Sequence, residues 1–458
     1  MNARRQKLNI VLVCAVTGVL LFGGRFVGRV SAVAKETYDN IEVFTNVLTL
    51  VQKNYVDSVT TKQLIDGAIT GMLSALDPHS SYLPPDLYKE LQVDTRGSFG
   101  GLGIEITTHD NVLTVVSPIE DTPAYRAGVK PGDQIIKIQD EFTKDMPLVE
   151  AVKRMRGAPG TKIHLSLRRE GVPRLLEMTL TREVIRIQSV KYRMLEKGYA
   201  YLRITQFQER TDDDLQRALT SLEKESGGAL SGLVLDLRNN PGGLLTQAVK
   251  IANEFVDSGL VVYTDGRLES QKQKYFAHKG GSHTEFPMIV LVNAGSASAS
   301  EIVAGCLQDR KRALVLGTQT FGKGSVQTIL PLDENSAIRL TTARYYTPNG
   351  RSIQATGITP DVVVENVIAH PKTGNGPAIP MIREQNLPRH FGNKKNGGPE
   401  LIEPKLEGEQ PEPETEPADT DVPLAREGEL GKDPQLDRAL ELLKSWNVFK
   451  TVVAQNAS

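Results

Sequence analysis

Two stretches indicate the fold of the central part of this chain: GLVLDLRNNPGG at residues 232–243 and MIVLVNAGSASASE at residues 288–301. Each begins with a short run of large apolar residues and ends in small or polar residues, as a buried strand does where it enters a loop. Helical spacing follows each stretch, from about Thr246 and about Ser298. This alternation of strand and helix predicts an α/β layer with a largely parallel sheet over about residues 186–365.

Reactive side chains follow these strands, at the ends where the chemistry of an α/β sheet is found. Ser298 begins the second helix, and the positive end of a helix dipole favours a developing anion there. The spacing of Ser298 and Glu301 also fits a capping box, in which the serine only stabilises the helix. In TFGKGSVQ, residues 320–327, Lys323 lies among residues expected to be buried, where a lysine can lose its proton and act as a general base. Gln327 could hold the Lys323 amine by a hydrogen bond.

Other kinds of site fit the sequence less well. The run GTQTFGK at residues 317–323 begins like a phosphate-binding P-loop, but Gly324 stands where that motif has serine or threonine, and a strand follows instead of a helix. None of the seven histidines lies in a glycine-rich strand end, which disfavours a Ser-His-Asp triad. His79 is interpreted as a structural turn residue without an acid partner. Cys306, on the helix that begins at Ser298, is interpreted as core packing and not as a thiol nucleophile.

Residues 96–170 have a different character, with short β-type runs separated by glycine and proline turns. The runs GGLGI at residues 100–104 and AGVKPGD at residues 127–133 together resemble a PDZ domain. The resemblance implies a loop whose backbone N–H groups hold the terminal carboxylate of a peptide, while the peptide adds a strand to the sheet edge. Only glycines let several amides converge on one anion without a side chain in the way. The expected peptide-binding residues are Gly101, Leu102, Gly103 and Ile104.

With these motifs in view, nearly the whole chain resembles the carboxy-terminal processing proteases, also called tail-specific proteases. The most specific parts are GSASASE at residues 295–301, FGKGSVQ at residues 321–327 and DLRNNPGG at residues 236–243. The resemblance implies a multidomain α+β protein, with a crotonase- or ClpP-like α/β protease core, an inserted PDZ domain and helical N- and C-terminal segments. It implies a serine endopeptidase that needs no metal and no organic cofactor. The corresponding site residues are the nucleophile Ser298, the general base Lys323, the orienting Gln327, and the oxyanion-hole donors Ala299 and either Gly242 or Gly243.

The same resemblance implies the partners of the protein. Substrates would be proteins with exposed apolar C-termini, recognised through the PDZ domain. A homo-oligomer, a dimer or larger, and activation by a separate adaptor protein also follow from the family. Arg156 is a candidate regulatory sensor in the PDZ domain, although the sequence favours an ordinary surface arginine at this position. The alternative function is a catalytically inactive PDZ scaffold that only binds tails, and the intact Ser298, Lys323 and Gln327 argue against it.

Residues 1–34 have the three parts of an export signal: a basic start, an apolar run at residues 10–24, and small residues up to Ala34. The apolar run is a little short for a membrane span, so a cleaved signal peptide and an uncleaved membrane anchor both stay open. A buried helix is disfavoured, because the run leaves no polar face. The lysine and arginine bias keeps the N-terminus in the cytoplasm. We therefore expect an extracytoplasmic protein of the bacterial periplasm, either secreted there or anchored in the inner membrane.

The remaining segments complete the division of the chain. Residues 35–95 show helical spacing and predict two or three helices, which either pack on the same subunit or form a dimer contact. The catalytic core is expected over residues 171–365. A Pro- and Glu-rich linker over residues 366–432 has too few apolar residues to form a core. A C-terminal helix is expected within residues 433–458, with one apolar stripe.

Composition excludes further classes of protein. The 54 lysines and arginines balance 55 aspartates and glutamates, so no overall positive field attracts nucleic acid, and we expect no nucleic-acid partner. Only two cysteines are present in 458 residues, which excludes a disulfide framework and a cysteine-based metal site.

Overall fold

The computed structural model describes residues 38–109, 112–144, 146–279, 283–365, 383–392 and 427–456. The chain divides into two compact units, Met1–Ala75 and Leu76–Ser458. In the described part of the first unit, a helix at residues 38–54 precedes α2 (Thr61–Ser74). The second unit begins with β1 (Ser81–Leu83) and α3 (Pro85–Arg96). The helices predicted between residues 35 and 95 are therefore confirmed, and there are three of them in the described part of that stretch.

The expected export signal, residues 1–34, lies outside the described residues. Among the helices that the structure describes, none is both long enough and apolar enough to cross a membrane. A cleaved signal and a membrane anchor therefore both stay predictions.

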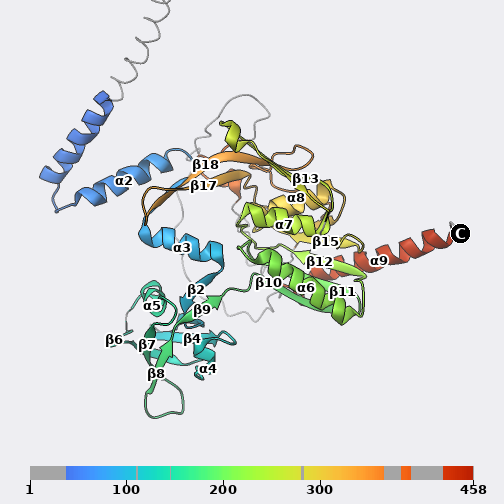
Figure 1. Ribbon diagram of the computed structural model, residues 1–458, viewed down its shortest axis with the longest axis horizontal. Coiled ribbons are helices and arrows are strands. Elements are labelled where there is room, and N and C mark those ends of the chain that lie inside the picture. The colour runs from blue at the N-terminus through green and yellow to red at the C-terminus, as the bar shows by residue number, and fades with distance from the viewer. Residues whose placement is uncertain are drawn as a thin grey trace, which may run out of the picture. The chain divides into compact units, whose positions relative to one another are not determined.

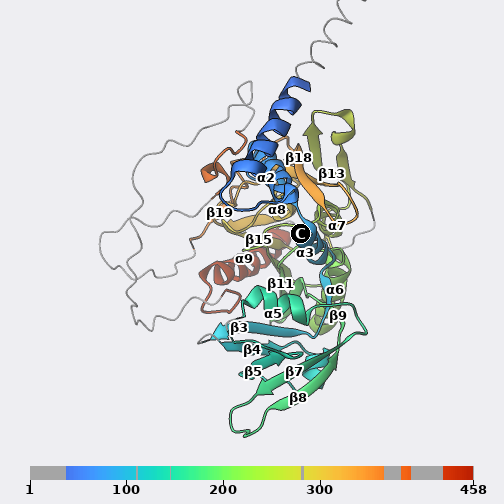
Figure 2. The same ribbon diagram turned by 90° about the vertical axis from the view of Figure 1, so that its left-hand side faces the viewer.

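A small β domain occupies the region that resembles a PDZ domain (Figure 2). Its main sheet has the strand order β3-β4-β5-β7-β8, and β6 pairs with β5. These strands are β3 (Ile104–His109), β4 (Val112–Pro118), β5 (Gln134–Ile138), β6 (Glu141–Phe142), β7 (Lys162–Arg168) and β8 (Leu176–Thr181), so the sheet continues past residue 170. Two helices accompany the sheet, α4 (Pro123–Arg126) and α5 (Leu148–Met155), and α5 lies beside β3. The chain enters the domain through β2 (Ser98–Gly101) and leaves it through β9 (Glu183–Arg186). These two strands pair with each other in antiparallel fashion.

The predicted parallel sheet is confirmed in the core (Figure 1). The strand order is β10-β11-β12-β15-β16-β19, in which only the edge pair β10 and β11 is antiparallel. Its strands are β10 (Val190–Glu196), β11 (Tyr199–Ile204), β12 (Gly232–Asp236), β15 (Met288–Val292), β16 (Leu314–Gly317) and β19 (Val362–Val363). Helices α6 (Thr211–Ser226), α7 (Leu245–Phe255) and α8 (Ala299–Asp309) cover one face.

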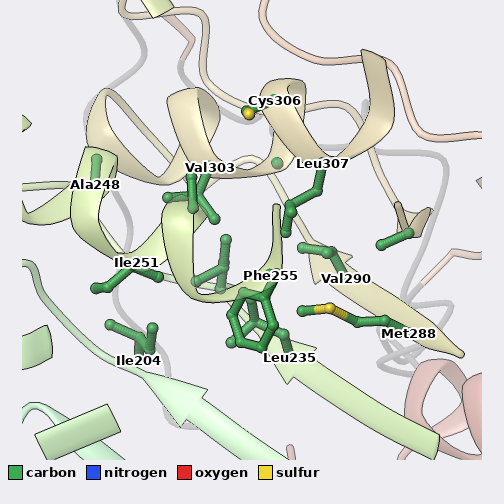
Figure 3. Packing of buried hydrophobic residues seen from close by; sticks show 14 of the residues in the cluster. Ile204, Leu235, Ala248, Ile251, Phe255, Met288, Val290, Val303, Cys306 and Leu307 are labelled. Atoms are coloured by element: carbon green, nitrogen blue, oxygen red, sulfur yellow. The ribbon is translucent and has the colours of Figure 1, made fainter. Parts of the chain in front are cut away.

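The main hydrophobic core lies between this face of the sheet and the three helices. Val303 and Leu307 of α8 point toward Ile251 and Phe255 of α7, as Figure 3 shows. Cys306 is fully buried in the same cluster, and burial raises the pKa of Cys306 to about 12. Because a thiolate is the reactive form of cysteine, the interpretation of Cys306 as core packing is supported.

A second, antiparallel sheet was not expected from the sequence. Its order is β1-β18-β13-β14, with β17 paired to β18. It is formed by β13 (Gly259–Gly266), β14 (Lys274–Ala277), β17 (Ser325–Pro331) and β18 (Ala337–Tyr346) in addition to β1, and the short helix η1 (Glu269–Gln271) lies between β13 and β14. Buried residues of β13 pack on the side of α7 and α8 away from the parallel sheet. The strand predicted after Lys323 is β17, so the residues after the P-loop-like run form a strand and not a helix.

The predicted C-terminal helix is α9 (Pro434–Asn456), and it packs on the other face of the parallel sheet. Leu436, Ala439 and Leu443 of α9 contact a cluster formed by Tyr201, Val234, Ile289, Leu291 and Leu316. Within the stretch expected to be a linker, residues 383–392 are described and include the short helix η2 (Glu384–Asn386), whose Glu384 is fully buried.

Candidate active site

Ser298 lies at a sharp turn between a buried strand and a helix. Strand β15 ends at Val292, and α8 begins at Ala299. Ser298 has φ +56° and ψ −112°, a conformation in which a residue with a side chain is strained. Its N–H donates to a carboxylate oxygen of Glu301, Oε2, at 2.8 Å, which is one half of the expected capping box. A strained residue at a helix N-terminus, following a parallel strand, is typical of a nucleophile that is presented at the edge of a sheet.

The turn after β12 approaches Ser298 so closely that glycine is required at position 242. Gly242 has φ +104°, and a side-chain carbon there would lie 2.9 Å from Cβ of Ser298 and 3.0 Å from the backbone nitrogen of Ala299. The Gly242 N–H donates to Oδ1 of Asn240 at 2.9 Å. The carbonyl of Asn240 in turn accepts hydrogen bonds from the Ala297 N–H and from a serine hydroxyl of α8. The structure therefore brings Gly242, one of the two predicted glycines, against Ser298 and Ala299, while the α-carbon of Gly243 faces the backbone of Phe207.

Lys323 lies between two glycines that bring the backbone against another loop. Gly322 has φ +98°, and a side-chain carbon on Gly324 would lie 2.3 Å from the backbone nitrogen of Gln354. The pKa of Lys323 is lowered, first because burial disfavours its charged form and second because Arg339 is near. The negative charges of Glu384, Glu301 and Asp77 oppose this shift. A lysine with a lowered pKa is a candidate general base.

Glu301 connects the loop of Ser298 with the loop of Lys323. Its carboxylate is fully buried, and Oε2 accepts both the Ser298 N–H at 2.8 Å and the Lys323 N–H at 2.9 Å. The other oxygen, Oε1, accepts the Gly322 N–H at 2.7 Å and the hydroxyl of Thr320 at 2.5 Å. Burial raises the pKa of Glu301 to about 7, while the four donors favour the charged carboxylate. The sequence indicated Glu301 only as a helix cap and did not show this connection.

Gln327 lies on β17, opposite Thr341 of β18, next to an irregularity in the strand pairing. Its amide nitrogen donates to the hydroxyls of Ser325 at 3.1 Å and Thr341 at 3.2 Å. The Thr341 hydroxyl donates in turn to Asp77 at 3.1 Å. The side chain of Gln327 is thus fixed by its neighbours, and its predicted contact with the Lys323 amine stays a prediction.

His79 does have an acid partner, so the interpretation of His79 as an unpartnered turn residue is wrong in that respect. Nε2 of His79 lies 2.8 and 3.0 Å from the two carboxylate oxygens of Glu384. Glu384 also accepts a hydrogen bond from Gln354 at 2.8 Å, and Gln354 accepts the Gly324 N–H at 3.0 Å. The sequence could not show this pairing, because Glu384 lies 305 residues away in the expected linker.

The predicted peptide-binding loop of the PDZ domain borders a cavity of about 180 Å³. All four predicted residues, Gly101 to Ile104, line this cavity. The other lining residues come from β2, β3, α5 and the position after α5: Phe99, Ile106, Val152, Met155 and Arg156. The guanidinium of Arg156 lies 4.5 Å from the centre of the Phe99 ring. Its buried Nε has no hydrogen-bond partner among the residues that the structure describes. Arg156 therefore borders the cavity, and its role as a sensor stays a prediction.

Comparison with known proteins gives three family matches. Residues 198–364 match Peptidase family S41, residues 100–180 match a PDZ domain, and residues 27–86 match an activating protease CtpB N-terminal domain. A carboxy-terminal-processing protease of Bartonella bacilliformis is 50% identical over 332 residues, 72% of this chain and 76% of that protein. Carboxy-terminal processing protease CtpA of Bacillus subtilis is 38% identical over 320 residues, 69% of this chain and 67% of that protein. Among solved structures, a photosystem II D1 C-terminal processing protease is 32% identical, with a TM-score of 0.41 and coverage of 70% of this chain and 92% of that chain.

Together, the S41 and PDZ matches define a serine peptidase with its own peptide-recognition domain. The chain belongs to the carboxy-terminal processing proteases. The resemblance predicted from the sequence motifs and the enzyme class are therefore confirmed. The α+β fold class is confirmed by the sheets of the structure together with the family matches.

Proposed function

We propose that Ser298 is the nucleophile of this protease, that Lys323 is its general base, and that Gln327 orients the lysine. One observation carries the proposal: a single oxygen of Glu301 accepts the backbone N–H groups of both Ser298 and Lys323, at 2.8 and 2.9 Å. The loops that bear the two residues are thus held together although 25 positions separate them (298 to 323). The strained backbone of Ser298 and the lowered pKa of Lys323 support the same assignment.

In the proposed reaction, the neutral amine of Lys323 takes the hydroxyl proton of Ser298, and Oγ attacks the carbonyl carbon of the peptide bond. The Ala299 N–H stabilises the resulting oxyanion together with the N–H of a glycine. We favour Gly243 for this glycine, because the Gly242 N–H already donates to Asn240. Lys323 returns the proton to the leaving amine as the C–N bond breaks, which leaves an acyl-enzyme. Lys323 then takes a proton from water, and the water oxygen attacks the acyl carbon. Lys323 returns this proton to Oγ of Ser298 as the ester bond breaks, which releases the second product and restores both side chains.

The PDZ domain is proposed to select the substrate by its C-terminus. The loop from Gly101 to Ile104 would bind the terminal carboxylate through backbone N–H groups, and the apolar residues of the cavity would bind the last side chain. Arg156 would sense the bound tail, because its unpartnered Nε borders the same cavity as the loop. Protein substrates with exposed apolar C-termini fit this groove.

The setting of the enzyme is proposed from the sequence. The export-signal pattern of residues 1–34 supports an extracytoplasmic, periplasmic location, with the chain either released or held at the inner membrane. Exposed apolar side chains on the helix at residues 38–54, such as Ile41 and Phe44, support a homo-oligomer. The resemblance to the family supports activation by an adaptor protein.

Cleavage of an unfolded model protein tests the proposed function directly. The full chain is mixed with two versions of that protein, one ending in apolar residues and one ending in two aspartates. Burial of one apolar side chain is worth about 1.5 kcal/mol. KM for the substrate with the apolar tail should therefore be about tenfold lower than KM for the substrate that ends in two aspartates. Binding of the apolar tail without any cleavage would instead support the inactive scaffold.

Arg156→Ala is expected to raise KM for the apolar-tailed substrate about tenfold, because a hydrogen bond to a charged group is worth about 1.5–3 kcal/mol. Arg154→Ala is the matched control, two residues earlier at the end of α5, since Arg154 pairs with Glu141 and Glu150 and does not border the cavity. Affinity for a peptide of the same tail, measured by fluorescence anisotropy, checks the binding step alone. An unchanged KM and an unchanged affinity in Arg156→Ala would contradict the sensor.

A further inference from the structure

The C-terminal segment at residues 427–443 contacts the turn that carries the oxyanion-hole glycines. This segment lies beyond residues 198–364, which match the peptidase family. It lies beside the end of β12, where Arg238 begins the turn that runs to Gly243. These contacts reach the turn from the face of the sheet that α9 covers.

Arg238 is fully buried, and the C-terminal segment supplies three of its hydrogen bonds. Its Nη1 donates to Oδ1 of Asp433 and to Oε1 of Gln435, both at 2.9 Å, and its Nη2 donates to Oδ2 of Asp433 at 2.6 Å. The remaining donors, on Nε and Nη2, bind the carboxylate of Asp236 at 2.7–3.1 Å. All five N–H donors of the guanidinium are therefore used. Asp433 is also buried, at 1% exposure, so loss of its charge would leave part of a buried cation unpaired.

Asn239, the next residue of the turn, is held by the same segment. It has φ +55°, a left-handed conformation, and its Nδ2 lies 3.0 Å from both carboxylate oxygens of Glu427. The Asn239 N–H donates to Oδ1 of Asn293 at 2.9 Å, and Nδ2 of Asn293 donates back to Oδ1 of Asn239 at 2.9 Å. Because Asn293 begins the loop that leads to Ser298, Glu427 acts on both loops of the site.

We propose that Asp433 and Glu427 are positioning residues of the active site, which hold the turn from Arg238 to Gly243 in its catalytic geometry from the C-terminal segment. This inference rests on the proposed role of that turn in the oxyanion hole. The N–H groups of an oxyanion hole act only where charge develops, so a displaced turn weakens binding of the transition state more than binding of the substrate. The protease domain would then be complete only when the C-terminal segment is docked on it.

Two variants of the full chain test this role. Asp433→Asn keeps the size of the side chain and removes its charge. Glu427→Ala removes a partly exposed carboxylate that pairs with Asn239 and also with Arg203. A displacement of about 1 Å can cost a factor of about 100 in rate, so we expect kcat to fall at least about tenfold in each variant while KM stays within about twofold. Because both act on one turn, the double variant should lose about as much as the worse single variant.

The matched controls are Asp437→Asn and Glu429→Ala, which alter partly exposed acidic residues of the same segment that do not bond to the turn. We expect both to keep kcat within about twofold of the wild type. Thermal unfolding monitors the folded fraction, and kcat is expressed per folded enzyme. The inference would be overturned if both Glu427→Ala and Asp433→Asn kept the wild-type kcat per folded enzyme. In that case an inactive Ser298→Ala would leave the proposed function intact. Activity in Ser298→Ala would instead overturn the proposed function.

Discussion

Replacing Ser298 by alanine is expected to lower kcat by a factor on the order of 10³ or more, because no acyl-enzyme can form without its Oγ. Lys323→Met is expected to lower kcat as far, since the two residues act as one unit and the methionine fills the same space without an amine. KM should change little in either variant, because neither side chain is proposed to bind the substrate. Steady-state cleavage of the apolar-tailed model protein checks both.

Ser221→Ala and Lys272→Met are matched controls for these two variants. Ser221 is exposed on α6 and bonds to a backbone carbonyl, and Lys272 pairs with Glu269 on the surface. Both controls should cleave at the wild-type rate. Undiminished cleavage in Ser298→Ala or in Lys323→Met would refute the dyad.

The pH dependence follows from the lowered pKa of Lys323. Cleavage should increase with pH as the amine loses its proton, with a midpoint below the ordinary lysine pKa of about 10.4. Between the lowered pKa of Lys323 in the native protein and its ordinary pKa in the unfolded chain, the unfolded chain binds more protons at this position. The contribution of Lys323 to the free energy of unfolding therefore rises with pH over this range. Lys323→Met should therefore be more stable than the wild type at neutral pH, and this gain should vanish above about pH 10.4. Chemical unfolding at pH 7 and pH 10 tests the sign.

The parts of the site that could be predicted from the sequence are local. Ser298 and Lys323 each follow a strand and lie next to glycines or small residues, and these patterns are contained within about eight residues. The parallel strands were predictable for the same reason, because a strand that is buried on both faces is a continuous apolar run, such as β12 and β15.

The parts that could not be predicted depend on pairs that are distant in the chain. Strand β1 pairs with β18, so Ser81 lies opposite Arg339, and no local pattern indicates this partner. No local pattern indicates the hydrogen bond between Arg238 and Asp433 either, because the two residues are 195 positions apart. The acidic side chains of Glu384 and Asp433 lie in or next to a polar stretch, where carboxylates are usually solvated, and only the fold shows that both are buried.

Glu301→Gln is expected to lower kcat about a hundredfold, although Glu301 is not proposed to touch the substrate. The four groups around its carboxylate all donate hydrogen bonds: the hydroxyl of Thr320 and the N–H groups of Ser298, Gly322 and Lys323. The Thr320 hydroxyl accepts the Ile358 N–H at 2.7 Å, so it is oriented to donate toward Glu301. A glutamine would turn an N–H₂ group toward one pair of these donors and leave that pair buried without an acceptor, at about 1–3 kcal/mol for each.

The expected loss in Glu301→Gln arises from geometry, because the loops of Ser298 and Lys323 would no longer share an acceptor. A shift of about 1 Å between a nucleophile and its base costs a factor of about 100. Glu254→Gln is the matched control, since Glu254 is a buried glutamate of α7 whose carboxylate accepts a hydrogen bond from Gln216 at 2.7 Å, away from both loops. Rates per folded enzyme, with the folded fraction taken from thermal unfolding, separate misalignment from loss of stability. If Glu301→Gln kept the wild-type kcat per folded enzyme, the Glu301 bridge would be a stabilising contact only, and the pairing of Ser298 with Lys323 would lose its main structural support.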